Sequence, residues 1–359
     1  MPDPGDIVIP PAALSAAVQA LFRRAGSHDE EAHLVAEQLV GANLAGHDSH
    51  GVGMVPAYVD VLQAGELHLN RRPETVLQAG AITVLDGGMG LGQVAAHEAM
   101  RVAIETARRH GLSLTGLRHS HHIGRIGHWA EQACAAGLVS LHFVNVISHP
   151  WVAPFGGTEA RLATNPVAIG VPRSGAEPLV LDFATSKFAV GKVRVALNRG
   201  QTLPPDVLLD AAGAPTQDPA ALFAIPHGAL LPFGGHKGSG LALMCEILGS
   251  ALFGGPVLTE VPTRRRIVNN MLTIVVDPAV FGDMPTFQRQ IDALVDWMHS
   301  ARPADPARGV RVAGEPEAHA RRERAAGIPL DAETWRQLGL AAARVGLKAA
   351  DWATLTDRA

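Results

Sequence analysis

The chain has 359 residues, of which 47% are hydrophobic and 18% are charged, with a net charge of −4. This composition allows two domains with large cores, and the mixed, slightly negative charge argues against a nucleic-acid partner. No stretch reaches the roughly 18 apolar residues of a membrane span, and no signal peptide opens the chain, so a soluble, cytoplasmic protein is expected. Cys134 and Cys245 lie in apolar stretches, as buried thiols of a reducing compartment do.

The first third of the chain predicts helices around one short strand. Apolar residues at helical spacing indicate two helices in residues 10–45 and a third that ends near Gly65. A strand at residues 82–85 leads through a glycine cluster into a helix over residues 93–110. The cluster is not a dinucleotide fingerprint, because Gln93 stands where the third glycine belongs.

The middle of the chain alternates strands and helices. Helical segments are expected at Trp129–Ala136 and after Ser239, and the strand-like apolar runs are Leu141–Val146, Val167–Val171 and Leu179–Phe183. After a loop, a closing strand is expected at Val310–Val312, followed by a helix over residues 331–347.

These elements predict an α/β protein in two parts. Residues 1–118 and 300–359 form a mainly helical domain, and residues 119–299 form an inserted α/β domain.

The first candidate catalytic segment is His47-Asp48-Ser49-His50-Gly51. Gly51 tolerates the left-handed turn after a helix, so His50 is expected at a helix C-terminus beside Ser49 and Asp48. There the helix dipole and a carboxylate favour the protonated imidazole, which is a good proton donor to a carbonyl oxygen. A polar helix cap without chemistry explains the same five residues equally well.

The densest histidine cluster runs from His119 to His128. A metal site is one interpretation, and it would make the protein a metal-dependent hydrolase or lyase, but no HExxH or paired CxxC accompanies the cluster. A loop before the helix at Trp129 whose amides and imidazoles contact a phosphate is favoured, and no metal is expected.

A glycine-rich segment, residues 231–240, resembles a phosphate-binding loop. Gly238 follows Lys237 where a P-loop needs Ser or Thr, so ATP chemistry is excluded. The segment still fits an anion, although a tight turn alone would also explain it.

Together, these segments resemble the malate/L-lactate dehydrogenase-like family, and most closely its hydroxycarboxylate dehydrogenase branch. The resemblance covers nearly the whole chain, and seven motifs in order carry it. They are Ser49-His50-Gly51 with Tyr58, the glycine cluster of residues 86–92, Ser120-x-His122-x-Gly124, Thr164-Asn165-Pro166, Asp182–Ser186, Pro232–Gly238 and Ala313–Pro316.

The resemblance implies reversible hydride transfer between NAD or NADP and a 2-hydroxy acid or its 2-oxo counterpart, in a homodimer with a mixed cofactor sheet of non-Rossmann type. It makes the helical part (1–118 and 300–359) the domain for substrate binding and dimerisation, and the inserted part (119–299) the cofactor-binding domain. It makes His50 the proton donor, with Ser49 as its hydrogen-bonding neighbour, and places Thr164 at the substrate. The residues that it assigns to the cofactor are His122, Ile123, Gly124, Asp182, Phe183, Ala184, Thr185, Ser186, His236, Lys237, Gly238, Asn270, Ala313, Gly314, Glu315 and Pro316.

Two positions depart from the family pattern. Many members carry an arginine four residues after the catalytic histidine, and here that residue is Met54. Because a guanidinium is the natural partner of a carboxylate, Arg125 is our candidate replacement, and Met54 would favour 2-oxo acids with aromatic or longer chains. Lys192, which follows Gly191 where the imine-reducing branch has an acidic residue, makes cyclic imines less favoured substrates. The sequence does not decide between NAD and NADP.

Overall fold

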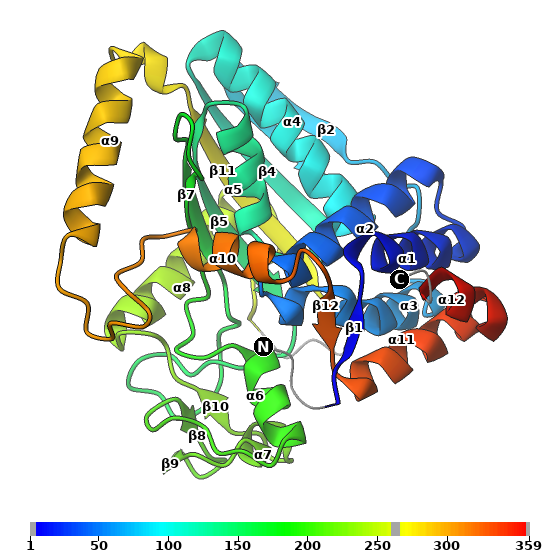
Figure 1. Ribbon diagram of the computed structural model, residues 1–359. Coiled ribbons are helices and arrows are strands. Elements are labelled where there is room, and N and C mark those ends of the chain that lie inside the picture. Colours follow the sequence, from blue (N-terminus) through cyan, green and yellow to red (C-terminus); the bar gives the residue numbers. More distant parts are fainter. Residues whose placement is uncertain (1–4, 260–265, 357–359) are drawn as a thin grey trace.

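The structure is a computed structural model that describes residues 5–259 and 266–356. Figure 1 shows a bundle of terminal helices beside a seven-stranded sheet, with a small three-stranded unit below them. In the described residues, no helix is both long and apolar enough to cross a bilayer.

The two ends of the chain build one helical bundle. In α1, Leu14, Val18 and Leu21 recur at helical spacing, and all three are fully buried. The C-terminal helices pack against the N-terminal ones, and a two-stranded antiparallel sheet joins the two ends. The elements are β1 (Ile7–Ile9), α1 (Pro11–Ala25), α2 (Asp29–Leu44), α3 (Val55–Gln63), β12 (Ile328–Leu330), α11 (Ala332–Arg344) and α12 (Ala349–Thr356).

The seven-stranded sheet has the order β2-β3-β4-β11-β5-β6-β7. Of its described pairs, β3 with β4 is parallel, and the others are antiparallel. The strands are β2 (Glu74–Ala79), β3 (Ile82–Asp86), β4 (Leu112–His121), β5 (Val139–Ile147), β6 (Val167–Val171), β7 (Leu179–Phe183) and β11 (Val268–Val276).

Helices cover both faces of this sheet. α4 (Gly92–His110) and α5 (Gly127–Ala135) share a core with Leu117, Val144 and Met271. α8 (His236–Gly249) packs on the other face, where Glu246 contacts Asn145. The sheet is therefore a middle layer between helices, as α/β proteins have.

The remaining elements lie around the sheet. The three-stranded unit consists of β8 (Leu208–Leu209), β9 (Pro215–Thr216) and β10 (Ala229–Leu230), with α6 (Val190–Asn198) and α7 (Ala220–Phe223). α9 (Met284–His299) stands at one side of the molecule in Figure 1, and α10 (Glu315–Glu323) crosses beside β7.

Two sequence expectations need comment. Val310–Val312 forms no strand; these residues lead into the turn that begins α10, so the expected closing strand is wrong. The helical part expected to end at residue 118 contributes β2, β3 and β4 to the large sheet, and the boundary falls inside β4. The parallel pair β3–β4 forms through α4, and local apolar patterns do not reveal which strands pair.

Candidate active site

The predicted motifs converge because of the sheet's strand directions. β3, β4, β5 and β7 all end at one edge, where β6 and β11 begin. Segments far apart in the sequence therefore meet there. For example, the amide of Thr185, after β7, donates to the carbonyl of Thr164, before β6, over 2.9 Å. We call this the site edge of the sheet.

His50 lies beside the site edge, on a short 3-10 turn, Asp48–His50. Ser49 Oγ is 3.0 Å from His50 Nδ1, so the expected hydrogen bond is present. The imidazole of His50 stacks on that of His122, with ring centroids 5.6 Å apart. Two histidines from distant motifs therefore form one pair.

The expected position of His50 at the end of a helix is wrong. α2 ends at Leu44, and the residue that turns the chain left-handed is Gly46, with φ +81°. Gly51 has φ −87°, and it must be glycine for another reason, because a Cβ there would lie 2.2 Å from the side-chain oxygen of Asn43. Gly46, which comes earlier than Gly51, was the sequence signal for the true end of this helix.

The expected protonation of His50 is also wrong for the free protein. Burial, followed by the charges of His47 and Arg125, lowers the pKa of His50 to about 4. Asp48 does not compensate, because its carboxylate is bound by Asn43 and Arg324. His50 is therefore neutral at pH 7 and ready to accept a proton.

A hydrogen-bonded chain supports His122 from behind. Gln93 Nε2 donates to the hydroxyl of Tyr58 over 2.8 Å, and that hydroxyl lies 2.6 Å from His122 Nδ1. Burial raises the pKa of Tyr58 and lowers that of His122, so both are neutral. Tyr58 must then donate to Nδ1, which leaves the proton of His122 on Nε2. The sequence motifs included Tyr58, the chain's one tyrosine, but gave it no role, and they did not assign Gln93 to the site.

Arg125 is buried next to these histidines, with 2% of the residue exposed. Its Nη2 donates to Glu131 over 2.5 Å, and its Nη1 lies 3.9 Å from Asp182. Among the described residues, Nε and Nη1 have no hydrogen-bond partner. A buried guanidinium with unpartnered N–H groups fits an anionic ligand.

Glu131, which the sequence did not single out, holds this arginine. Its second oxygen accepts from Arg321 of α10 over 2.5 Å, so one carboxylate joins the loop before α5 to the C-terminal part of the chain. Although burial opposes ionisation, Arg125 and Arg321 hold the pKa of Glu131 below its ordinary value. Glu131 is therefore a charged anchor for Arg125.

The other two residues assigned to the substrate differ in their surroundings. Thr164 is half-buried and contacts the end of β7 through its carbonyl. Met54 packs against the core of the terminal helices.

Most residues assigned to the cofactor gather at the site edge. The stretch Asp182–Ser186 finishes β7, and Asp182 accepts from the amide of Gly127 over 2.7 Å. His236, Lys237 and Gly238 begin α8, which is tied to Thr185 through the amide of Phe233. In contrast, the side chain of Ile123 lies wholly in the core, and Asn270 bonds to Asn145 and to the amide of His119.

The turn Ala313–Pro316 lies at the opposite end of β7. The carbonyl of Ala313 accepts from Val180 over 3.4 Å, close to where that strand begins. The helix that follows this turn reaches the segment of His50, because Glu317 Oε1 lies 3.1 Å from His47 Nε2. The turn itself borders a separate cavity, which is described below.

The histidine cluster His119–His128 separates in space. His119 pairs with Asp86, His121 lies edge-on to Tyr58, and His128 lies against Trp129. No group of three His, Cys, Asp or Glu side chains that could bind a metal occurs in the described ranges. The amide of Gly127, at the start of α5, donates to Asp182, so it is not free for the phosphate contact expected there, which stays a prediction.

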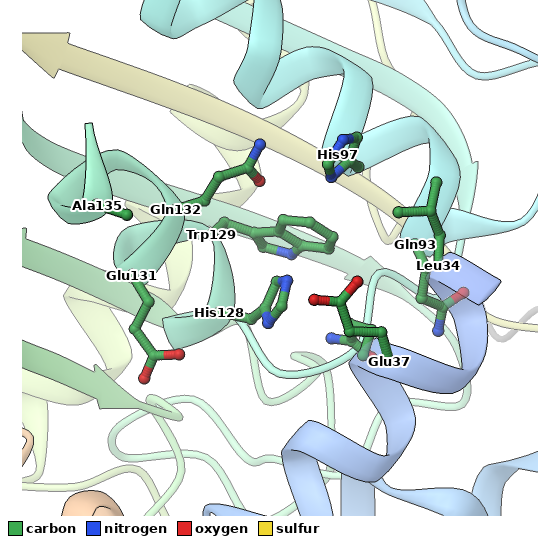
Figure 2. Close-up of a pocket in the computed structure, with 10 residues that line it drawn as sticks. Leu34, Glu37, Gln93, His97, His128, Trp129, Glu131, Gln132 and Ala135 are labelled. Atoms are coloured by element: carbon green, nitrogen blue, oxygen red, sulfur yellow. The ribbon is translucent and has the colours of Figure 1, made fainter. Parts of the chain in front are cut away.

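His128 belongs to a second cavity, of about 280 Å³, on the far side of the His122–Gly124 loop. Figure 2 shows His128 and Trp129 there with Glu37, His97 and Gln132. Neither His50 nor Arg125 lines it, so it is separate from the histidine pair.

Buried neutral histidines make stability depend on pH. Burial lowers the pKa of His142 to about 3, and burial, followed by the charge of Arg266, lowers that of His121 to about 4. Below pH 6.5 the unfolded chain takes up protons that the folded chain does not, so stability falls with the pH. For each such group we expect the free energy of unfolding to be lower by about 2 kcal/mol at pH 5 than above pH 7.

Denaturant midpoints at pH 7.5 and pH 5.0 measure this effect. The variant H142N should show a smaller difference between the two pH values, because one titrating group is gone. Equal midpoints of the parent protein at both pH values would contradict the prediction.

Comparison with known proteins gives a consistent result. A family model described as malate/L-lactate dehydrogenase matches residues 9–339. The chain is 48% identical over 334 residues to hydroxycarboxylate dehydrogenase B of Escherichia coli, covering 92% of each chain. It is 39% identical to an L-lactate dehydrogenase of Cupriavidus necator, covering 85% of this chain and 88% of the relative.

Solved structures agree. The sulfolactate dehydrogenase of Methanocaldococcus jannaschii superposes with a TM-score of 0.86 at 32% identity, covering 96% of this chain and 99% of that one. These relatives are named as dehydrogenases of hydroxycarboxylate, L-lactate and sulfolactate. The chain therefore belongs to the malate/L-lactate dehydrogenase family.

Proposed function

We propose that the protein transfers a hydride between NAD(P)H and a 2-oxo acid, and in reverse from the 2-hydroxy acid. The observation that carries this proposal is the pairing of His50 with Arg125 in one site. A proton-transferring imidazole lies within the electrostatic reach of a buried guanidinium that keeps unpartnered N–H groups. In a 2-oxo acid, the guanidinium would bind the carboxylate, and the imidazole would exchange a proton with the neighbouring carbonyl oxygen.

In this mechanism Arg125 binds the substrate carboxylate and fixes the carbonyl against His50. The nicotinamide, when bound, supplies the hydride. In oxidation the neutral imidazole of His50 accepts the proton of the hydroxyl, and in reduction the protonated imidazole gives it to the carbonyl oxygen as negative charge develops there. Reduction therefore requires His50 to take up a proton first, because a pKa of about 4 leaves the imidazole neutral at pH 7. Ser49 orients the ring through Nδ1, which leaves Nε2 for the proton transfer.

The residues present fit a dinucleotide on this mixed sheet in a non-Rossmann arrangement. The glycine-rich start of α8 lies against the end of β7, where the positive end of the helix dipole suits an anion. The unpartnered guanidinium atoms of Arg125 lie beside the same strand. His122, fixed by Tyr58, would contact the nicotinamide end.

We propose 2-oxo acids with aromatic or longer side chains as the substrates. Met54 no longer supports this preference, because it packs into the helical core. An aromatic cluster beyond the end of β5 supports it better, where Trp151 contacts His149, His227 and Phe223. The chain enters this cluster directly after β5, which ends at the site edge.

The experiment measures the loss of reduced-nicotinamide absorbance with purified protein. It uses phenylpyruvate, 2-oxoglutarate, oxaloacetate and pyruvate, each with NADH and with NADPH. Oxidation that depends on a 2-oxo acid supports the proposal, and none with any acid would overturn it. The alternative, a metal-dependent hydrolase or lyase, has no support in the relatives or in the dispersed histidines.

We also propose that the protein is a cytoplasmic homodimer. Residues 241–248 of α8 are apolar apart from Glu246, which faces the sheet, yet Leu243, Met244 and Ile247 are 42–49% exposed. A second copy covering this face would explain them. The two cysteines are free and buried, which is consistent with a reducing compartment.

The variant M244E/I247E is therefore expected to be a monomer, because it places two carboxylates in an apolar contact. Light scattering after size-exclusion chromatography measures the mass. The control is L340E, at an exposed leucine of α11. A parent protein of monomeric mass, or a double variant that remains dimeric, would contradict the interface.

A further inference from the structure

A basic cavity of about 550 Å³ lies at the start of β7, away from the histidine pair. Its lining includes Arg173, Arg308, Arg311 and Arg322, against the carboxylates of Glu177 and Glu315. Two of these arginines, Arg173 and Arg308, pair with carboxylates outside the lining, so the remaining arginines are Arg311 and Arg322. Nothing in the reaction at His50 requires four arginines at this distance.

The negative groups around the cavity are largely engaged. Glu315 accepts from the amide of Val312 over 2.9 Å and pairs with His299 at 3.0 Å. Asp292 pairs with Arg173 at 2.9 Å, and Asp305 pairs with Arg308 at 3.4 Å. These carboxylates do not neutralise the rest of the cavity.

Arg311 and Arg322 have no such partner. Arg311 Nε donates only to the carbonyl of Arg308, over 3.3 Å, and neither guanidinium has a carboxylate within ion-pair distance in the ranges that the structure describes. Both residues line the cavity. Two unneutralised arginines facing one cavity fit a phosphate, which accepts forked pairs of hydrogen bonds.

The cavity also borders the proposed cofactor site. Ala313 and Glu315, which the resemblance assigns to the cofactor, line it together with Leu179. β7 runs from Leu179 at the cavity to Phe183 at the site edge, four steps of about 3.3 Å each. A dinucleotide with its nicotinamide at His50 would lie along this strand and bring its adenosine half to the arginines.

We infer that this cavity binds the 2′-phosphate of NADP through Arg311 and Arg322, and that the protein prefers NADPH to NADH. The inference rests on the proposed function for the placement of the nicotinamide. A phosphate monoester is close to doubly charged at pH 7, whereas the 2′-hydroxyl of NAD is neutral, so the arginines favour the phosphorylated cofactor. Glu177 is the lining carboxylate that could serve the hydroxyl instead. It is one charge against those of Arg311 and Arg322, because Glu315 is held by His299 and by the amide of Val312.

Calorimetric titration at low salt tests this with 2′,5′-ADP, 5′-AMP and inorganic phosphate as probes. We expect the parent protein to bind 2′,5′-ADP at least tenfold more tightly than 5′-AMP. The variant R311A/R322A should lose that difference while its affinity for 5′-AMP stays within twofold. R311K/R322K, which keeps the charge without the fork, should be intermediate. The control R336A, at an exposed arginine of α11, should bind both nucleotides as the parent does.

Each other outcome overturns the inference. Equal affinity of the parent for the two nucleotides would show that the cavity does not read the 2′-phosphate. Discrimination that survives in R311A/R322A would place the phosphate elsewhere. Inorganic phosphate binding as tightly as 2′,5′-ADP would identify a free-phosphate site. A parent that binds 2′,5′-ADP as expected but oxidises no reduced nicotinamide with any 2-oxo acid would count against the proposed function alone.

Discussion

Replacing His50 with alanine is expected to lower kcat/KM for 2-oxo acid reduction by about 10²–10⁴-fold, the usual contribution of a positioned general acid. The imidazole is held by Ser49 and stacked on His122, so its removal leaves the carbonyl oxygen without this proton donor. The KM for the reduced nicotinamide should change much less than kcat. Steady-state kinetics with a saturating cofactor measure the loss.

The control for this experiment is H33A, because His33 is an exposed histidine near the start of α2, whereas His50 follows the end of that helix. It should retain full activity. A variant H50A that kept more than half of the parent activity would exclude His50 as the donor, and His122 would become the candidate. The melting temperature of H50A, measured alongside, separates lost chemistry from lost folding.

Replacing Arg125 with lysine is expected to raise the KM for a 2-oxo acid by about ten- to hundredfold, since hydrogen bonds to charged groups contribute about 1.5–3 kcal/mol each. Lysine keeps a charge beside Glu131 and Asp182, so the ion pairs that hold the loop survive. It loses the Nε–H and Nη1–H groups that are unpartnered in the structure. The KM for the cofactor should stay near the parent value.

A pH profile gives this prediction a second readout. The charge of Arg125 lowers the pKa of His50, so the neutral variant R125M should shift the acid limb of 2-hydroxy acid oxidation to higher pH. E131Q, which weakens the anchor of Arg125, should raise the KM for the 2-oxo acid less than R125K does. An unchanged KM in R125K would end the assignment of Arg125 to the substrate.

The sequence predicted the elements that depend on local pattern. The strands Val167–Val171 and Leu179–Phe183 and the helices of the first 45 residues are confirmed to within a few residues, because apolar periodicity and glycine or proline boundaries act locally. The expected strand at Val310–Val312 failed because it has no neighbour to pair with, and a short β-branched run is not a strand without one.

The sequence also determined the family, because the order and spacing of seven motifs can be recognised without knowing which residues are in contact. It placed Ser49 next to His50 correctly, since adjacent residues need no fold to meet. Its error was the charge of His50. The prediction relied on a helix dipole, but His50 does not end α2, and burial together with the charges of His47 and Arg125 lowers its pKa.

Only the tertiary structure decided which motifs share a site. The strand directions bring Thr164 and Thr185 to one edge of the sheet, and they carry the turn at Ala313 to the other end of β7. Glu131 and Gln93 gained roles because the fold sets them against Arg125 and Tyr58, and neither lies in a motif of its own. Sequence order fixes residue types and their local structure, whereas distances, burial and therefore pKa values exist only once the strands have paired.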